Sequence, residues 1–271
     1  MTPSSENKKW VLVTGASSGM GRAAAEELAR LGYGVFALDR RTPDLSGDSI
    51  VPLTADVTDG ESLERAFARV KEQCPGLFAI CHFAGIYVLN AMSEMDEAEF
   101  TRAFDVNLFG VFRVNRTFLP LLSRGSRILI TTSELAPLYP LPFTGLYAVT
   151  KSALDKYACS LRTELKLLGI DVSVLRPGAV NTGMLDVSTT ALDRFCRETK
   201  LFSVHSKRFK AIVNAVEARN VPPEKIARRA AKLISRKHPP YVTAINRNPL
   251  LLLLNALPPR LQTSILQAVL K

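Results

Sequence analysis

Short apolar runs alternate along the chain with longer segments in which apolar residues recur every three or four positions. The short runs predict strands, and most of the segments between them have the period of a helix. The predicted strands lie near Val11, Val35, Val51, Ala79, Ile128, Val172 and Val242. Strands that alternate with helices pair in parallel. The pattern therefore predicts an α/β fold with a doubly wound parallel sheet.

Local signals refine the connections between these elements. The segment from Thr58 to Glu61 has the spacing of a capping box and predicts the start of the helix LERAFARVKE. Pro222 and Pro223 predict the start of a further helix, because proline is favoured in a first turn. Only the ten residues 40–49 separate two of the strands, so we expect the crossover helix there to be reduced.

The last segment, 248–271, carries an apolar residue at every fourth position, namely Leu257, Leu261, Ile265 and Val269. This spacing predicts an amphipathic terminal helix, and its apolar run is too short to span a bilayer. One interpretation is ordinary packing against an apolar surface. The alternative is peripheral contact with an anionic membrane, because basic charge lies beside the apolar face.

Composition changes this picture mainly through charge. The chain is 271 residues long and 47% hydrophobic, enough for one large core, and nothing indicates a linker, so a single domain over 1–271 is expected. The net charge is +10, and residues 194–271 hold 16 Lys and Arg against 3 acids, or +13, which leaves −3 for the rest. No recognised nucleic-acid-binding motif accompanies these charges, so no nucleic-acid partner is expected.

The N-terminal residues bear on the location of the protein, and its cysteines and histidines bear on metal chemistry. The N-terminal residues MTPSSENKK lack the apolar stretch of a signal peptide, so a cytoplasmic location is expected, with contact at a membrane surface as the alternative. The four cysteines and three histidines are scattered without ligand spacing. No metal site is therefore predicted, and a histidine-based triad is disfavoured.

A glycine-rich turn follows the first predicted strand. The apolar run Trp10 to Val13 leads into TGASSGMG and then into a helical pattern. Gly15 allows a sharp turn, Gly19 lets a phosphate approach the backbone, and Gly21 lets the helix pack against the sheet. Free amides at a helix start can bind an anion. This context predicts a nucleotide-binding fold of the Rossmann type.

The chemistry of the chain is indicated by Tyr147 and Lys151, which a helix would place on one face. A tyrosine has a pKa of about 10, and a nearby ammonium lowers that pKa by favouring the phenolate. Ser133 follows an apolar strand and could bind a substrate oxygen, although serine there is commonly a turn former. Asn107 lies in an apolar helical stretch, either as a satisfied core amide or as part of a polar relay.

Together these residues resemble the short-chain dehydrogenase/reductase family, whose pattern is TGxxxGxG, an Asn, a Ser, YxxxK and then PG. The resemblance covers the chain from about Trp10 to Thr182. It implies that Tyr147 is the general acid/base and that Lys151 lowers its pKa and contacts the nicotinamide ribose. It further implies that Ser133 orients the carbonyl or alcohol and that Asn107 holds a water in a proton relay.

The same resemblance implies a set of cofactor contacts around the nucleotide. Besides Tyr147 and Lys151, these are Gly15, Ser17, Ser18, Gly19, Met20, Gly21, Asp56, Val57, Ala84, Gly85, Pro177, Gly178, Val180 and Thr182. Two departures qualify the match. His82 and Phe83 stand where the family has two asparagines, which puts central-sheet stability in doubt. The interval from Ser133 to Tyr147 is one residue longer than usual, which indicates an insertion over the substrate pocket.

The choice of nicotinamide cofactor depends on Asp39, at the end of the run VFALD. A carboxylate there accepts hydrogen bonds from ribose hydroxyls and repels a 2′-phosphate, which favours NAD. Arg40 and Arg41 follow directly, and a guanidinium is a good phosphate partner, so NADP stays possible.

These observations predict a nicotinamide-dependent oxidoreductase acting on a secondary alcohol or ketone. A substrate lobe is expected at about 183–220, and the predicted substrate contacts are Ser133, Leu141, Phe143, Tyr147 and Met184. A largely apolar pocket favours a bulky hydrophobic substrate, steroid-like or retinoid-like. Fatty acyl ketones are the alternative, and a catalytically silent NAD(P)-binding regulator is a second class of function. The resemblance also implies a homodimer or homotetramer.

Overall fold

Seven parallel strands form the sheet in the computed structural model, which describes residues 8–45, 47–217 and 219–271, apart from the side chains of 183–189 and 215–217. The strand order is β3-β2-β1-β4-β5-β6-β7. Their bounds are β1 Trp10–Thr14, β2 Gly34–Asp39, β3 Ile50–Thr54, β4 Leu77–His82, β5 Leu122–Thr131, β6 Asp171–Pro177 and β7 Val242–Ile245. The order reverses between β1 and β4, which is where such sheets bind ligands at their carboxyl ends.

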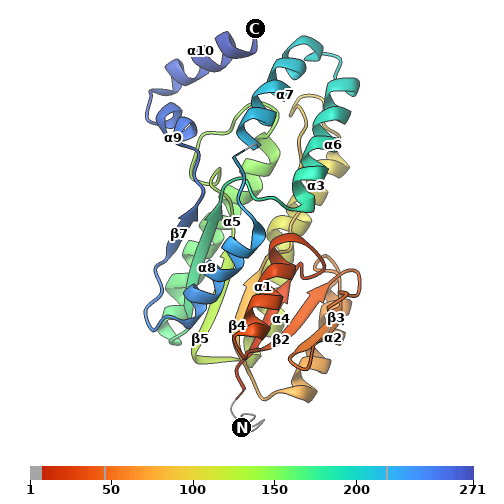
Figure 1. Ribbon diagram of the computed structural model, residues 1–271, viewed down its shortest axis with the longest axis vertical. Coiled ribbons are helices and arrows are strands. Elements are labelled where there is room, and N and C mark those ends of the chain that lie inside the picture. The colour runs from red at the N-terminus through yellow and green to blue at the C-terminus, as the bar shows by residue number, and fades with distance from the viewer. Residues whose placement is uncertain (1–7, 46, 218) are drawn as a thin grey trace.

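Helices cover both faces of the sheet, so the Rossmann-type doubly wound prediction is confirmed (Figure 1). Helices α1 (Gly19–Arg30) and α8 (Pro223–Ser235) pack on one face of the sheet and form a hydrophobic core with it. The other face packs on α2 (Gly60–Gln73), α4 (Gly110–Phe118) and α5 (Gly145–Leu167). Among the described residues of 40–49 there is no helix, as the sequence predicts.

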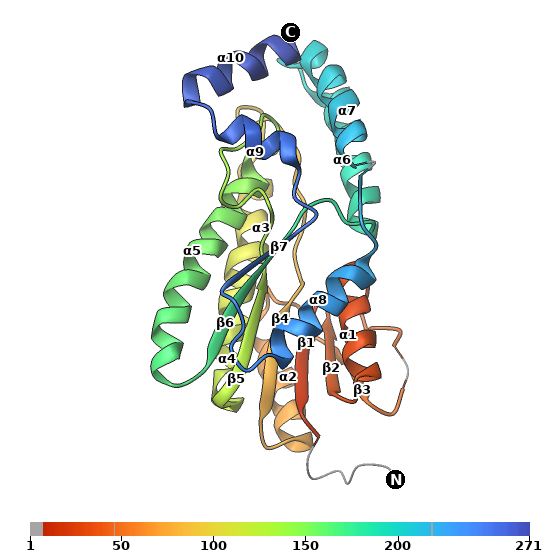
Figure 2. The ribbon, with the colours of Figure 1, turned by 60° about the vertical axis from the view of Figure 1, so that its left-hand side comes forward.

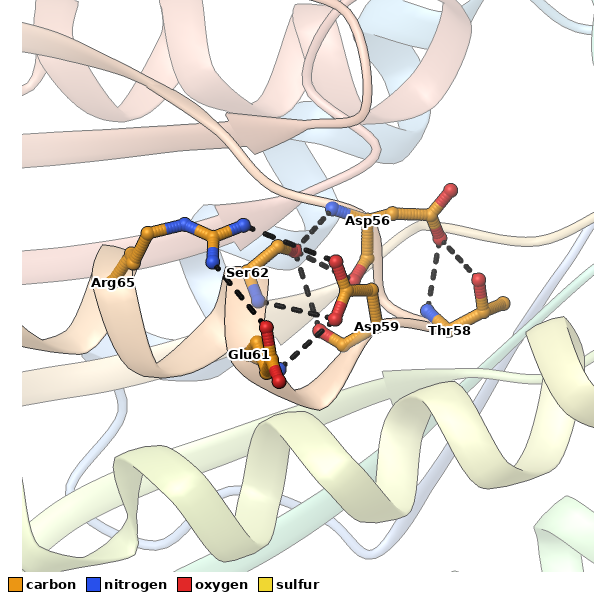
Figure 3. Close-up of polar contacts among 6 residues, drawn as sticks. All are labelled: Asp56, Thr58, Asp59, Glu61, Ser62 and Arg65. Atoms are coloured by element: carbon orange, nitrogen blue, oxygen red, sulfur yellow. Dashed lines mark hydrogen bonds and ion pairs between the residues drawn. The ribbon is translucent and has the colours of Figure 1, made fainter.

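The start of α2 differs from the predicted capping box. Asp59 is the N-cap, and its carboxylate accepts hydrogen bonds from the backbone of Glu61 and Ser62 (Figure 3). The hydroxyl of Thr58 instead donates to Asp56 Oδ1 at 2.8 Å. The prediction of Thr58 as the cap was wrong because Thr58 belongs to the turn held by Asp56, which leaves the next carboxylate to cap the helix.

A second layer lies beyond the carboxyl ends of the strands (Figure 2). It contains α6 (Gly183–Glu198) and α7 (Ser203–Glu217), followed after β7 by α9 (Pro249–Asn255) and α10 (Pro259–Leu270). Phe143, Phe195 and Phe209 form the core of this layer, with Phe143 within 5.2 Å of each of the other two rings by centroid distance. The lobe therefore has a small core of its own.

The terminal segment forms two helices where one was predicted. Pro258 is the N-cap of α10 and Pro259 follows it, and neither can donate the backbone hydrogen bond that would continue α9. The expected apolar row is also not the covered one. Leu261, Ile265 and Val269 are exposed, whereas Gln262 and Leu270 are buried.

Candidate active site

The turn after β1 has the geometry of a phosphate cradle. Gly15 and Gly19 adopt positive φ angles of 72° and 53°, which favour glycine. A Cβ on Gly21 would lie 2.1 Å from the carbonyl oxygen of Gly15, so only glycine fits there. The N-cap of α1, Ser18, forms no side-chain cap hydrogen bond. The first amides of α1 are therefore left for an anion.

A cavity of about 930 Å³ opens over this turn and follows the ends of β1, β2 and β4. Its walls include most of the predicted cofactor contacts, namely Gly15, Ser18, Gly19, Met20, Gly21, Asp39, Arg40, Asp56, Val57, Ala84, Gly85 and Thr182. Ser17 lies behind the wall, where its backbone N–H donates to Asp39 Oδ2 at 3.1 Å. The size of the cavity and its free helix N-terminus fit a dinucleotide.

The carboxylate of Asp39 is held by backbone amides at the rim of this cavity. Its two oxygens accept from the N–H groups of Ser17, at 3.1 Å, and Arg41, at 3.3 Å. The side chains of Arg40 and Arg41 are exposed beside it. A carboxylate and two cations thus share the site that would meet the adenosine ribose.

Asp56 lies across the same cavity with one oxygen engaged. Its Oδ1 accepts from the backbone and hydroxyl of Thr58, at 2.9 Å and 2.8 Å, while its backbone N–H donates to Ser62 (Figure 3). The residue is fixed by both contacts and still offers acceptor capacity on its second oxygen. An exocyclic amino group on a base could use it.

Tyr147 and Lys151 lie on the first turns of α5, where burial acts on both. Burial raises the pKa of Tyr147 to about 12, and a hydrogen bond with Ser133 opposes that rise. Burial lowers the pKa of Lys151 to about 8. The expected lowering of the tyrosine pKa by Lys151 is not found in this structure, because only Ser133 opposes the rise and loss of water around the phenol dominates.

Lys151 lies between the end of β5 and the wall of the first cavity. Its Nζ donates to the carbonyl oxygen of Thr131 at 3.2 Å, at the end of β5. A Cβ on Gly85 would lie 3.5 Å from that Nζ and 3.2 Å from Asn107 Oδ1. Because Gly85 has no side chain, the backbone in the wall of the first cavity lies close to Lys151 and Asn107, two of the predicted catalytic residues.

Asn107 lies in a π-helical segment, Asp105–Phe109, between α3 (Glu97–Phe104) and α4. Its Oδ1 accepts from the backbone of Ile86 at 2.8 Å, and its Nδ2 donates to the carbonyl of Ile86 and the hydroxyl of Thr150. Single π-helical turns recur at functional sites. The buried amide joins the loop at Ile86 to α5 and keeps one Oδ1 lone pair for a further donor.

A second cavity adjoins the first, because both have Met20, Gly85 and Thr182 in their walls. Of the predicted residues, its walls contain Ser133, Leu141, Tyr147, Lys151, Pro177, Gly178 and Val180. Phe143 is not among them, because its positive φ of 66° turns the ring into the aromatic core of the lobe. The side chain of Met184 lies outside the described residues.

Sequence reasoning missed several walls of this second cavity. Tyr87 lies with its ring centroid 4.8 Å from that of Tyr147. Glu134 follows Ser133 directly, and its Oε2 accepts from the backbone of Asn248 at 2.7 Å. Leu251 reaches the cavity from α9. Glu134 could have been suspected from its place in the chain, whereas the terminal leucines gave no sign of which one points inward.

His82 fills the place of the family's first asparagine and is satisfied there. It is buried at the end of β4, and its Nε2 donates to Asn115 Oδ1 at 2.8 Å. Asn115 donates in turn to the hydroxyl of Tyr157 at 3.1 Å. Burial lowers the pKa of His82 to about 4, so the ring is neutral at pH 7. Although His82 departs from the family's asparagine, it still gives the end of β4 a hydrogen-bonded side chain.

Comparisons with known proteins show the family to which this chain is similar. A model of the short chain dehydrogenase family matches residues 9–193. Estradiol 17-beta-dehydrogenase 2 of Mus musculus is 34% identical over 189 residues, covering 66% of this chain and 50% of that protein. The chain thus spans about half the length of that relative. The 3-ketodihydrosphingosine reductase of Bacteroides thetaiotaomicron is 26% identical over 236 residues, covering 87% of each chain.

A solved structure extends the likeness to the fold. The alcohol dehydrogenase of the archaeon Thermococcus sibiricus, complexed with 5-hydroxy-NADP, superposes with a TM-score of 0.72 at 25% identity. The match covers 90% of this chain and 99% of that one. The family model, these relatives and the geometry of the two cavities lead to one conclusion: the chain belongs to the short-chain dehydrogenase/reductase family.

Proposed function

We propose that the protein interconverts a ketone and a secondary alcohol on a bulky apolar substrate. The observation that supports this most is the position of Ser133, Tyr147 and Lys151 in the walls of the second cavity, where it adjoins the first. A carbonyl oxygen beside Ser133 and Tyr147 would be within reach of both hydroxyls. The bound nicotinamide supplies or accepts the hydride.

The protonation states favour ketone reduction. With a pKa of about 12, Tyr147 is a neutral phenol at pH 7 and can donate its proton to the oxygen that gains charge as the hydride arrives. Ser133 orients that oxygen by a second hydrogen bond, and the Lys151 ammonium stabilises the phenolate that remains. Asn107 fixes the Ile86 backbone and offers a lone pair to a water that could return the proton.

NAD is the proposed cofactor, and NADP is the alternative. The Asp39 carboxylate at the cavity rim favours the ribose hydroxyls and disfavours a phosphate in the same place. Against it stand the exposed guanidinium groups of Arg40 and Arg41, which share that rim. The carboxylate is the better positioned group, because two backbone amides hold it.

The apolar walls support a steroid-like substrate first and a long-chain ketone second. The walls include Leu141, Phe209, Ile212, Val213 and Leu251. The relative that acts on estradiol favours a rigid polycyclic substrate. The long-chain alternative is favoured by the match to a 3-ketodihydrosphingosine reductase over 87% of both chains.

One assay tests these proposals together. The purified protein is mixed with NADH or NADPH and either a 17-ketosteroid or a long-chain 3-ketone, and loss of absorbance of the reduced nicotinamide is followed. Faster consumption with the steroid and NADH is the expected result. Faster consumption with the long-chain ketone would move the assignment to the second class, and no consumption with either would contradict the proposal.

A further inference from the structure

Helices α9 and α10 and the turn between α6 and α7 form one end of the molecule (Figures 1 and 2). Apolar side chains on these segments are exposed. In both views the C-terminus lies beside that turn, and α10 packs on α7. The exposed residues there are between 41% and 66% accessible, and they are Leu201, Val204, Leu250, Leu253, Leu261, Ile265 and Val269. These seven residues are called the distal apolar surface below.

The fold does not need this surface for its own stability, because both helices are fixed through other residues. Leu270 packs into the aromatic core of the lobe. Helix α9 is held at both ends by hydrogen bonds to the loop after β5. Asn248 donates to Glu134 at 2.7 Å, and Asn255 Oδ1 accepts from the backbone of Tyr139 at 2.7 Å. The outward leucines are therefore presented on a rigid support.

Charge at this end is one-sided. Residues 225–271 contain no Asp or Glu. Lys207, Arg260 and Lys271 are exposed, and none of them forms an ion pair with the described side chains. Arg247 is also exposed, but its charge acts on Glu134, where it opposes the rise that burial causes in the pKa of that carboxyl. The acids of the lobe that are described are engaged, since Asp193 pairs with Lys210, Glu198 with Arg194, and Glu94 accepts from residues 199–201.

We propose that the distal apolar surface docks on an anionic phospholipid bilayer. Apolar side chains flanked by free cations match an interface of acyl chains beneath negative headgroups. A second copy fits less well, because two basic faces without acids would repel each other. No helix among the described residues is long and apolar enough to cross a membrane, and docking at the surface requires none.

Docking would place the substrate cavity next to the lipid. Leu251 lines that cavity, while Leu250 and Leu253 of the same short helix face outward. One helix thus separates the cavity from the bilayer, so an apolar ketone dissolved in lipid would reach it without crossing water. This last step rests on the proposed function, whereas docking itself does not.

Co-sedimentation of the full chain with vesicles tests docking without any enzyme assay. Binding is expected to vesicles of phosphatidylglycerol and phosphatidylcholine and to fall at least tenfold with phosphatidylcholine alone. The double variant Leu261→Asp/Ile265→Asp should weaken binding at least tenfold, and Arg260→Ala should weaken it about fivefold, as expected for one cation at a charged surface. Leu167→Asp is the matched control, because Leu167 is 82% exposed at the far end of α5.

Three results would overturn the proposal. The wild-type chain could fail to sediment with anionic vesicles, or the double variant could bind as well as wild type. The double variant could also convert a larger wild-type assembly into a smaller one in sedimentation velocity while vesicle binding is absent, which would assign the surface to a second copy. Circular dichroism of each variant verifies that the fold is retained. Ketone reduction in detergent-free buffer separates failure of docking from failure of the proposed function.

Discussion

Tyr147 is partly buried and Lys151 is buried near the start of α5, and loss of water moves their pKa values in opposite directions. The phenol is kept protonated and the ammonium becomes easier to deprotonate. This combination suits a proton donor near neutral pH. It also separates the roles of the two residues, so each can be tested alone.

Tyr147→Phe should lower kcat for ketone reduction by about 10²–10⁴, because it removes only the transferable proton. The dissociation constant of the cofactor, measured by fluorescence titration, should stay nearly unchanged. A variant that keeps wild-type kcat would contradict proton transfer from this residue.

Activity should decline above pH 8, where Lys151 loses its charge. The same titration raises the contribution of Lys151 to stability between pH 8 and the unfolded pKa near 10.5, because the unfolded chain binds the extra proton there. A fall in kcat without a fall in melting temperature is thus expected between about pH 8 and 9, because above pH 9 the raised pKa of the buried Cys81 thiol acts in the opposite direction. Lys151→Arg stays charged and should move the decline to higher pH, and an unchanged pH profile would assign the decline to another group.

Asp39→Ala should shift cofactor preference toward NADP, because the carboxylate that disfavours a 2′-phosphate is lost while Arg40 and Arg41 remain. The ratio of kcat/KM for NADH and NADPH measures this. If the wild-type protein already prefers NADPH strongly, the arginines dominate and the NAD proposal fails.

At the scale of elements, α9 contributes a wall to the second cavity through Leu251. Leu251→Ala removes apolar surface from the cavity wall, and Leu250→Ala removes the same atoms from the outer face of the helix. The first should lower kcat/KM for a soluble apolar ketone by up to about fiftyfold, because Leu→Ala removes three carbons worth roughly 0.8 kcal/mol each when fully buried. The second should leave it unchanged, and equal effects would place α9 outside the pocket.

The sequence predicted the elements that are set by local patterns, and it did not predict those that depend on contacts between distant residues. The strands and the glycine turn come from local patterns, and the described residues follow them. The predicted cofactor contacts come from the family resemblance instead, and most of them lie in the walls of the first cavity. The cap of α2 was misassigned because Thr58 and Asp59 are both good caps, and only the turn at Asp56 decides between them. Phe143 was misplaced because a positive φ cannot be read from a Phe. The covered side of α10 depends on α7, which is distant in sequence.

At the scale of the whole molecule, a neutral His82 inside the central sheet makes stability depend on acid. Its pKa is about 4 when folded and near 6.5 when unfolded, so the unfolded chain binds more protons in that window. Stability from this group is fully present above pH 6.5 and is lost as the pH falls toward 4. The loss by pH 5 should be about 2 kcal/mol.

His82→Asn should remove that acid sensitivity. Urea unfolding at pH 7.5 and pH 5.0 measures the free energy of unfolding of both proteins. The decrease between the two pH values should be about 2 kcal/mol smaller in the variant. Equal decreases would mean that the acid sensitivity arises elsewhere, for example from carboxylates in ion pairs.

Positions around the two cavities differ in how well they should tolerate substitution, because some lie in very close contact with another backbone segment. A Cβ at Gly178 would lie 2.0 Å from the carbonyl oxygen of Asn246, as restrictive as the contact at Gly21. A side chain at Gly21 or Gly178 would require the backbone to move, so these two positions stay glycine. The walls of the second cavity also include the large apolar residues Leu141, Ile212 and Leu251. Such a protein can acquire new substrates through single changes there while inheriting its nucleotide chemistry intact.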